Sequence, residues 1–82
     1  MKLLKFQADW CGPCKMLTKV MESIEFPYEV VAVNIDDNEE LVEKYGIRGV
    51  PTLVLLDDKE GIVSVHIGAL DKSSIEARFI NI

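Results

Sequence analysis

The chain has 82 residues and a formal net charge of −5, with 14 Asp and Glu residues against 9 Lys and Arg residues. This length fits one domain over residues 1–82, and a hydrophobic fraction of 49% indicates a packed core. The acidic balance, without a basic patch, excludes a nucleic-acid binder, and the apolar runs are too short to cross a membrane.

The first element expected in the chain is a strand over residues 3–8. Lys5 interrupts the apolar run there, so no signal peptide is expected and the protein is predicted to be cytoplasmic. A helix should follow Cys11, with Pro13 in its first turn and Pro27 marking its end. Its apolar residues recur on one helical face: Leu17, Val20, Met21 and Ile24.

The middle of the chain predicts a strand and then a short helix. Residues 28–35 are a near-continuous β-branched and apolar run, which is typical of a strand covered on both faces. The acidic residues 36–40 supply caps and first-turn acids for a helix, with Gly46 as a left-handed stop. This acidic run therefore needs no bound metal to explain it.

The last third of the chain predicts a hairpin and a final helix. Residues 52–56 and 62–67 are expected to pair as antiparallel strands. Asp71 can cap the last helix. Its inward residues would be Ile75 and Phe79, with Ile82 near the end. The order βαβαββα predicts an α/β fold, in which a four-stranded mixed sheet is flanked by helices.

Both cysteines of the chain lie in the CGPC tetrapeptide at residues 11–14, directly after Trp10. Two thiols at this spacing can close and reopen a small disulfide ring, so they are candidates for a two-electron redox switch. In the cytoplasm, such a pair is more often catalytic or metal-binding than structural. A zinc half-site is disfavoured because there is no second CxxC, and the single histidine, His66, is expected on a surface strand.

Three segments resemble the thioredoxin family. Residues 8–16 (ADWCGPCKM) resemble its active-site segment, and residues 45–52 (YGIRGVPT) resemble its second signature, whose proline is cis. Residues 68–70 resemble the third, a loop beside the active site. The resemblance implies a thioredoxin-like fold in a short, glutaredoxin-sized form that lacks the family's extra N-terminal strand and helix.

The predicted chemistry depends on where each sulfur lies. Cys11 is expected to be exposed at the helix N-cap, where the helix dipole and free N–H groups favour a thiolate. Its pKa should therefore fall below the free value of about 8.5. Cys11 would attack a target disulfide, and Cys14, one turn into the helix, would resolve the mixed disulfide. Gly12 would let the backbone bend closely around the sulfurs, and Pro13 would stiffen the ring.

A substrate-binding surface is expected around Cys11. By resemblance Pro51 is cis and presents the N–H and C=O of Val50 to an extended peptide, which could pair as an added strand. The alternative is an ordinary trans proline that opens an edge strand. The expected apolar patch comprises Trp10, Ile35, Val50, Pro51, Ile67, Gly68 and Ala69. For Ile35 and Ile67 a place in the core is equally open.

Lys5 departs from the family pattern, which usually has a buried acid at this position. The acid's basic partner corresponds to Ala32, and Gln7 stands in place of a second tryptophan. One hypothesis places Lys5 under the active site, where its cation would favour a thiolate or a partly neutral amine would handle protons. The other leaves Lys5 and Gln7 solvated on an uncovered face of the sheet.

The resemblance implies a protein-disulfide reductase with no cofactor or metal beyond the cysteine pair. A monomer is expected, because the small apolar patch around Cys11 does not suit a stable dimer interface. Its partners would be an NADPH-dependent thioredoxin reductase and clients such as ribonucleotide reductase or peroxidases. One alternative is a glutaredoxin-like oxidoreductase recharged by glutathione or another small thiol, although that family has CPYC-type rings. Another is a non-catalytic thioredoxin-fold binding module, which the intact CxxC argues against.

Overall fold

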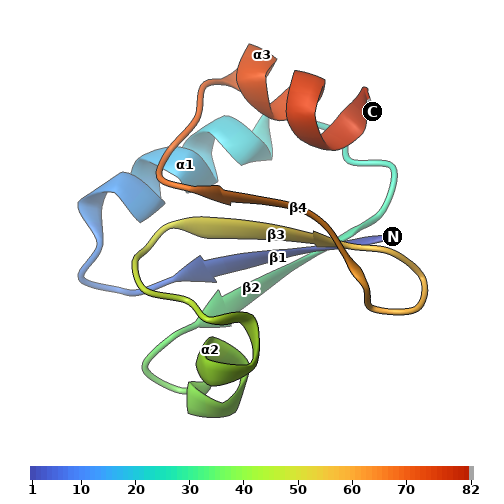
Figure 1. Cartoon of the computed structure of the whole chain (residues 1–82). Coiled ribbons are helices and arrows are strands. Elements are labelled where there is room, and N and C mark those ends of the chain that lie inside the picture. The colour runs from blue at the N-terminus through green and yellow to red at the C-terminus, as the bar shows by residue number, and fades with distance from the viewer. Residues whose placement is uncertain (82) are drawn as a thin grey trace.

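Four strands form one mixed sheet in the computed structural model, which describes residues 1–81 (Figure 1). Ile82, expected near the end of the last helix, lies outside the described residues. The strands are β1 (Lys2–Gln7), β2 (Glu29–Asn34), β3 (Thr52–Leu56) and β4 (Ile62–Ile67). They lie in the order β2-β1-β3-β4, with β1 parallel to β2 and the other pairs antiparallel. The predicted element order and the mixed sheet are confirmed.

Helices cover both faces of this sheet (Figure 1). The first helix, α1 (Gly12–Glu22), lies on one face with α3 (Lys72–Ile75), and α2 (Glu39–Tyr45) lies on the other. As predicted, Asp71 caps α3, because its Oδ1 accepts a hydrogen bond from the Ser74 N–H at 2.9 Å. Gly46 ends α2 at a φ of +64°, a conformation that glycine adopts without strain.

The chain beyond α3 differs in detail from the simple helix expected there. It continues directly into a π-helical turn, η1 (Glu76–Ile80), whose wider winding the sequence pattern did not predict. Ile75 and Phe79 still point inward and are fully buried. The Tyr28 hydroxyl also donates a hydrogen bond to the Phe79 carbonyl, which ties this turn to the start of β2.

The core consists of two apolar layers, one on each face of the sheet. The layer under α1 and α3 contains Leu3, Leu17, Met21, Ile24, Leu53, Leu55, Ile75 and Phe79. The layer under α2 contains Leu4, Phe6, Val33, Val54 and Leu56. All five residues of β3 are buried because this central strand contributes to both layers.

The prediction that the strand at residues 28–35 is covered on both faces is wrong. β2 lies at the edge of the sheet, and Val33 is its single buried residue. Val30 on the same strand is 36% exposed. The β-branched run therefore indicates a strand but does not show that the strand is buried. The strand that is buried along its whole length is β3.

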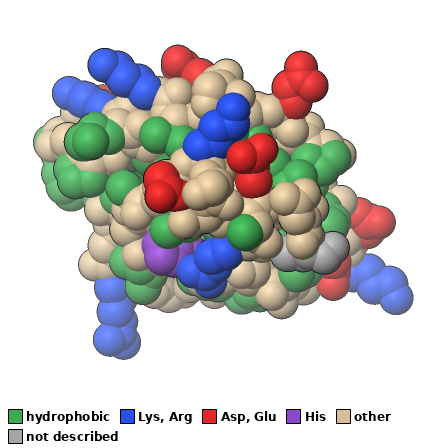
Figure 2. Space-filling view, turned by 90° about the horizontal axis from the view of Figure 1, so that it is seen from above, with side chains coloured by type: hydrophobic (Ala, Val, Ile, Leu, Met, Phe, Trp, Pro, Cys, Tyr) green, Lys and Arg blue, Asp and Glu red, His purple; other side chains and the backbone are tan. Residues whose placement is uncertain are grey.

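Charged side chains are interspersed on the face of the molecule that carries α1 and α3 (Figure 2). Seen from the side of α1 and α3, basic and acidic side chains alternate without a large patch of either sign (Figure 2). None of the helices within residues 1–81 has the length and apolar character needed to cross a membrane.

Candidate active site

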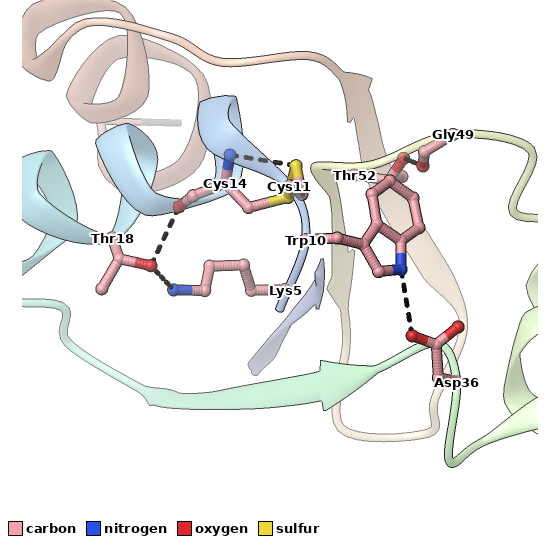
Figure 3. Close-up of a disulfide and its surroundings, with 8 residues drawn as sticks. All are labelled: Lys5, Trp10, Cys11, Cys14, Thr18, Asp36, Gly49 and Thr52. Carbon is pink, nitrogen blue, oxygen red and sulfur yellow. Dashed lines mark hydrogen bonds between the residues drawn. A yellow bond between two sulfur atoms is a disulfide. The ribbon is translucent and has the colours of Figure 1, made fainter. Parts of the chain in front are cut away.

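The two cysteines lie where β1 leads into α1. The Cys11 N–H donates to the Ala8 carbonyl at 3.1 Å, and this tight turn places Cys11 at the N-cap of α1. Cys11 and Cys14 form a disulfide, and the Cys14 N–H donates to Cys11 Sγ at 3.1 Å (Figure 3). The predicted N-cap position and ring are thus present, with Pro13 in the first turn.

The predicted exposure of Cys11 is wrong for this disulfide form. Cys11 is only 4% exposed and Cys14 only 3%, because Ala8, Ile35 and Val50 pack around the sulfurs. Thiol–disulfide exchange needs access to one sulfur only, along the line of the S–S bond. In the disulfide form these neighbours therefore leave little of either sulfur accessible to a partner.

The predicted cis bond is present between Val50 and Pro51. The Gly68 N–H donates to the Pro51 carbonyl at 2.8 Å, so the third signature segment lies directly against the second. Gly68 has a φ of +102°, a backbone conformation that residues other than glycine rarely adopt. Within residues 1–81 the N–H and C=O of Val50 make no hydrogen bond, which leaves both for an incoming peptide.

The expected apolar patch divides into exposed and recessed residues. Trp10 is 67% exposed and Ile67 66% exposed, so Ile67 is not a core residue. Ala69 is also exposed, and Pro51 is buried. The half-buried members are Ile35, Val50 and Gly68. Ile35 and Val50 contact the cysteine pair itself.

The indole of Trp10 is held by a residue that the sequence analysis assigned only to a helix start. Trp10 Nε1 donates to Asp36 Oδ2 at 3.1 Å, across the gap between the active-site turn and the end of β2 (Figure 3). Nothing in a separation of 26 residues along the chain signals this contact. The bond fixes an otherwise exposed ring beside the disulfide.

Lys5 lies under the active site, and the hypothesis that it is solvated is wrong. It is 7% exposed, and its Nζ donates to Thr18 Oγ1 at 2.7 Å. The Thr18 hydroxyl in turn donates to the Cys14 carbonyl at 3.0 Å, so Lys5 is linked to the first turn of α1 (Figure 3). Ala32 is its register partner on β2. Gln7 is half-buried, and its Oε1 has no hydrogen-bond partner among residues 1–81.

Burial lowers the pKa of Lys5 below its ordinary 10.5, and the negative charge of Glu22 partly opposes this shift.

Sequence reasoning missed Thr18, although a signal was present. Thr18 lies four residues after Cys14, one turn along the same helical face, where the neighbouring Leu17 is fully buried.

No group of three or more His, Cys, Asp or Glu side chains within residues 1–81 could hold a metal ion. His66 lies on β4, where its Nδ1 is 2.6 Å from a guanidinium nitrogen of Arg78. Burial and the Arg78 charge lower the pKa of His66.

Comparisons with known proteins agree with this geometry. The thioredoxin family model matches residues 1–81. The thioredoxin of Pseudomonas aeruginosa is 40% identical over 92% of this chain and 72% of its own length. The thioredoxin of Chlamydia caviae is 46% identical over 96% of this chain and 78% of its own.

Solved structures extend the agreement to three dimensions. A mutant thioredoxin from Halobacterium salinarum superimposes with a TM-score of 0.85 at 41% identity, covering 93% of this chain and 68% of that one. The likeness in fold thus extends over most of this chain. The chain belongs to the thioredoxin family, and with its Cys11–Cys14 disulfide it is a thiol-disulfide oxidoreductase that reduces protein disulfides.

Proposed function

We propose that Cys11 is the attacking thiol of this protein-disulfide reductase and Cys14 the resolving thiol. The observation that carries this assignment is the hydrogen bond from the Cys14 N–H to Cys11 Sγ at the N-terminus of α1. In the reduced protein the same N–H, together with the helix dipole, stabilises negative charge on Cys11. Cys14 lies inside the helix and lacks these donors.

The reaction then takes two exchange steps. The Cys11 thiolate attacks one sulfur of the target disulfide, forms a mixed disulfide, and releases the other target sulfur as a thiolate. Cys14 loses its proton to solvent and attacks Cys11 Sγ. The Cys11–Cys14 disulfide forms, and the second target sulfur leaves and takes up a proton. Two electrons pass from the protein to its target.

The surface around the ring suits an extended segment of a client protein. The Val50 N–H and C=O can pair with the client's backbone as an added strand. Trp10 and Ile67 supply apolar contact on the exposed rim, and Ile35, Val50, Gly68 and Ala69 complete the surface. The side chain of Pro51 is buried, so its part in client binding is to present Val50 through the cis bond. A Cβ at Gly12 would meet no heavy atom within 4 Å, so this position beside Cys11 faces open space.

The proposed partners follow from family membership. An NADPH-dependent thioredoxin reductase would recharge the ring, and the clients would be enzymes that end a cycle with a disulfide, such as ribonucleotide reductase or peroxidases. The protein would act as a monomer in the cytoplasm, without nucleic acid, membrane or metal. The cysteine pair would carry the electrons without a further cofactor.

Insulin reduction tests this proposal. The protein should precipitate insulin chains at the expense of NADPH in the presence of a thioredoxin reductase, and Cys11→Ser should abolish the reaction. Cys14→Ser should instead accumulate a covalent mixed disulfide with the client. Equal trapping by Cys11→Ser would reverse the assignment of the two thiols. Recharging by glutathione alone, with no response to a panel of reductases, would favour the glutaredoxin-like alternative.

A further inference from the structure

A buried lysine is an unusual neighbour for a redox disulfide, because an uncompensated ammonium in a protein interior costs free energy. Lys5 is on the central strand β1, and its neighbours in the same row of the sheet are Ala32 and Leu53, both uncharged. The one hydrogen bond of the Lys5 side chain within residues 1–81 goes to Thr18 on α1. The side chain is therefore directed at the helix that carries Cys14.

The hydrogen bonds fix which partner donates. The Thr18 hydroxyl has one hydrogen, and it goes to the Cys14 carbonyl. Its oxygen must then accept from Lys5 Nζ, so Nζ is held as a donor two hydrogen bonds from the Cys14 backbone. The carboxylate of Glu22, one turn further along α1, is the charged group that supports the protonated amine. A positive charge is thus fixed beneath the first turn of α1.

Cys14 also has a route to solvent on this side. A surface pocket of about 320 Å³ lies beside it, lined by Gln7, Ala8, Asp9, Cys14, Lys15 and Thr18. Gln7 also lines this pocket, although its Oε1 is buried and has no hydrogen-bond partner among residues 1–81. The proton that Cys14 loses during resolution can leave through water in the pocket.

We propose that Lys5 is a positioning residue for the resolving thiol: its ammonium, anchored on Thr18, stabilises Cys14 as a thiolate in the second exchange step. This inference rests on the proposed roles of Cys11 and Cys14. The Cys14 proton passes to water in the pocket, the Cys14 thiolate attacks Cys11 Sγ, and the target thiolate leaves. Lys5 keeps its proton throughout and acts by its charge.

A pH-jump experiment isolates this step. The reduced protein reacts at acid pH with one equivalent of an aromatic disulfide whose thiolate is coloured, so that Cys11 holds the mixed disulfide while Cys14 is protonated. A jump to higher pH starts resolution, and release of the coloured thiolate gives its rate. The pH midpoint of that rate reports ionisation of Cys14.

Lys5→Met should raise this midpoint by about one pH unit, since loss of a nearby opposite charge shifts a titration by about that much. Near neutral pH, resolution should slow about tenfold. Lys5→Arg keeps the charge and should retain the wild-type midpoint. Thr18→Val removes the anchor and should shift the midpoint in the same direction as Lys5→Met. Lys19→Met is the matched control, because Lys19 is an exposed lysine on the same helix.

Two results would overturn the inference. One is a slower resolution in Lys5→Met with an unmoved midpoint, which is what a merely structural role produces. The other is an equal shift in Lys19→Met. If Lys5→Met does not fold, an unmoved pH midpoint in Thr18→Val would overturn the inference on its own. Failure of the proposed function looks different: if the two thiols had the opposite roles, Cys11→Ser rather than Cys14→Ser would accumulate the mixed disulfide, whatever the midpoints of the Lys5 and Thr18 variants.

Discussion

At the scale of single residues, Cys11 is subject to two opposing effects. Its burial at 4% exposure disfavours a charged sulfur, while the Cys14 N–H and the helix terminus favour it. The favourable donors are part of the backbone and are already in place, so no rearrangement is needed when the ring opens. Because both sulfurs are largely covered, we expect a partner that binds the residues around them, such as Val50, to react faster than a small thiol in bulk solution.

Lys5 should make the stability of the protein depend on pH. In the folded protein its pKa lies below the usual 10.5, chiefly because of burial. Between the folded-state and unfolded-state pKa values the unfolded chain binds more protons, so the free energy of unfolding rises with pH across that window. Below the window the cost of the buried charge is fully present.

Lys5→Met should therefore be more stable than the wild type at neutral pH, and this advantage should shrink as the pH rises toward 10.5. Denaturant unfolding at several pH values measures the difference. Burial also raises the pKa of Tyr28, whose ordinary value of 10.0 lies close to that of lysine. Its contribution to the pH dependence is the same in the wild type and in Lys5→Met, so it cancels in the stability difference. A stability difference that stays constant over this range would show that Lys5 titrates alike in both states.

At the scale of elements, the sequence predicted the features that depend on a few neighbouring residues. The bounds of β3 and β4, the Asp71 cap and the left-handed Gly46 follow from hydrophobic alternation and from turn and cap preferences of a few neighbouring residues. The cysteine pair and cis Pro51 were predictable because each lies within a short contiguous motif. These features need no knowledge of the rest of the fold.

What the sequence did not predict depends on contacts between distant segments. Whether β2 is an edge strand depends on which strands flank it, and a β-branched run alone does not say. The burial of Cys11 results from Ile35 and Val50, which lie 24 and 39 residues further along the chain. Thr18 and Asp36 acquire roles through hydrogen bonds to Lys5 and Trp10 that tertiary packing alone creates.

A matched pair of substitutions on β2 tests its position at the edge. Val33 is 4% exposed and lies in the layer under α2, whereas Val30 is 36% exposed. Val33→Ala should lower the free energy of unfolding by about 2 kcal/mol through the cavity that it leaves. Val30→Ala should cost less than about 1 kcal/mol. Chemical denaturation measures both, and similar losses would mean that β2 is covered on both faces after all.

At the scale of the whole molecule, the sheet has one functional end. The carboxyl end of β1 leads to the cysteines, and the register places Phe6, Thr52 and Ile67 side by side at that end. The opposite end of the same strands brings Lys2, Leu56 and Ile62 together. β4 thus carries one exposed isoleucine at each end, of which Ile67 alone is near the ring.

The two isoleucines provide an internal comparison for client binding. Ile67 is 66% exposed and Ile62 is 57% exposed, so replacing either with serine removes a similar apolar surface. Ile67→Ser should lower kcat/KM for insulin about tenfold, mainly through KM, because a client loses apolar contact beside Cys11. Ile62→Ser should leave kcat/KM for insulin unchanged. The rate with a small aromatic disulfide should be the same in both variants, since a small reagent does not reach β4. Equal losses in the two variants would place client binding along the whole strand, and a loss with the small disulfide would assign Ile67 to the ring itself.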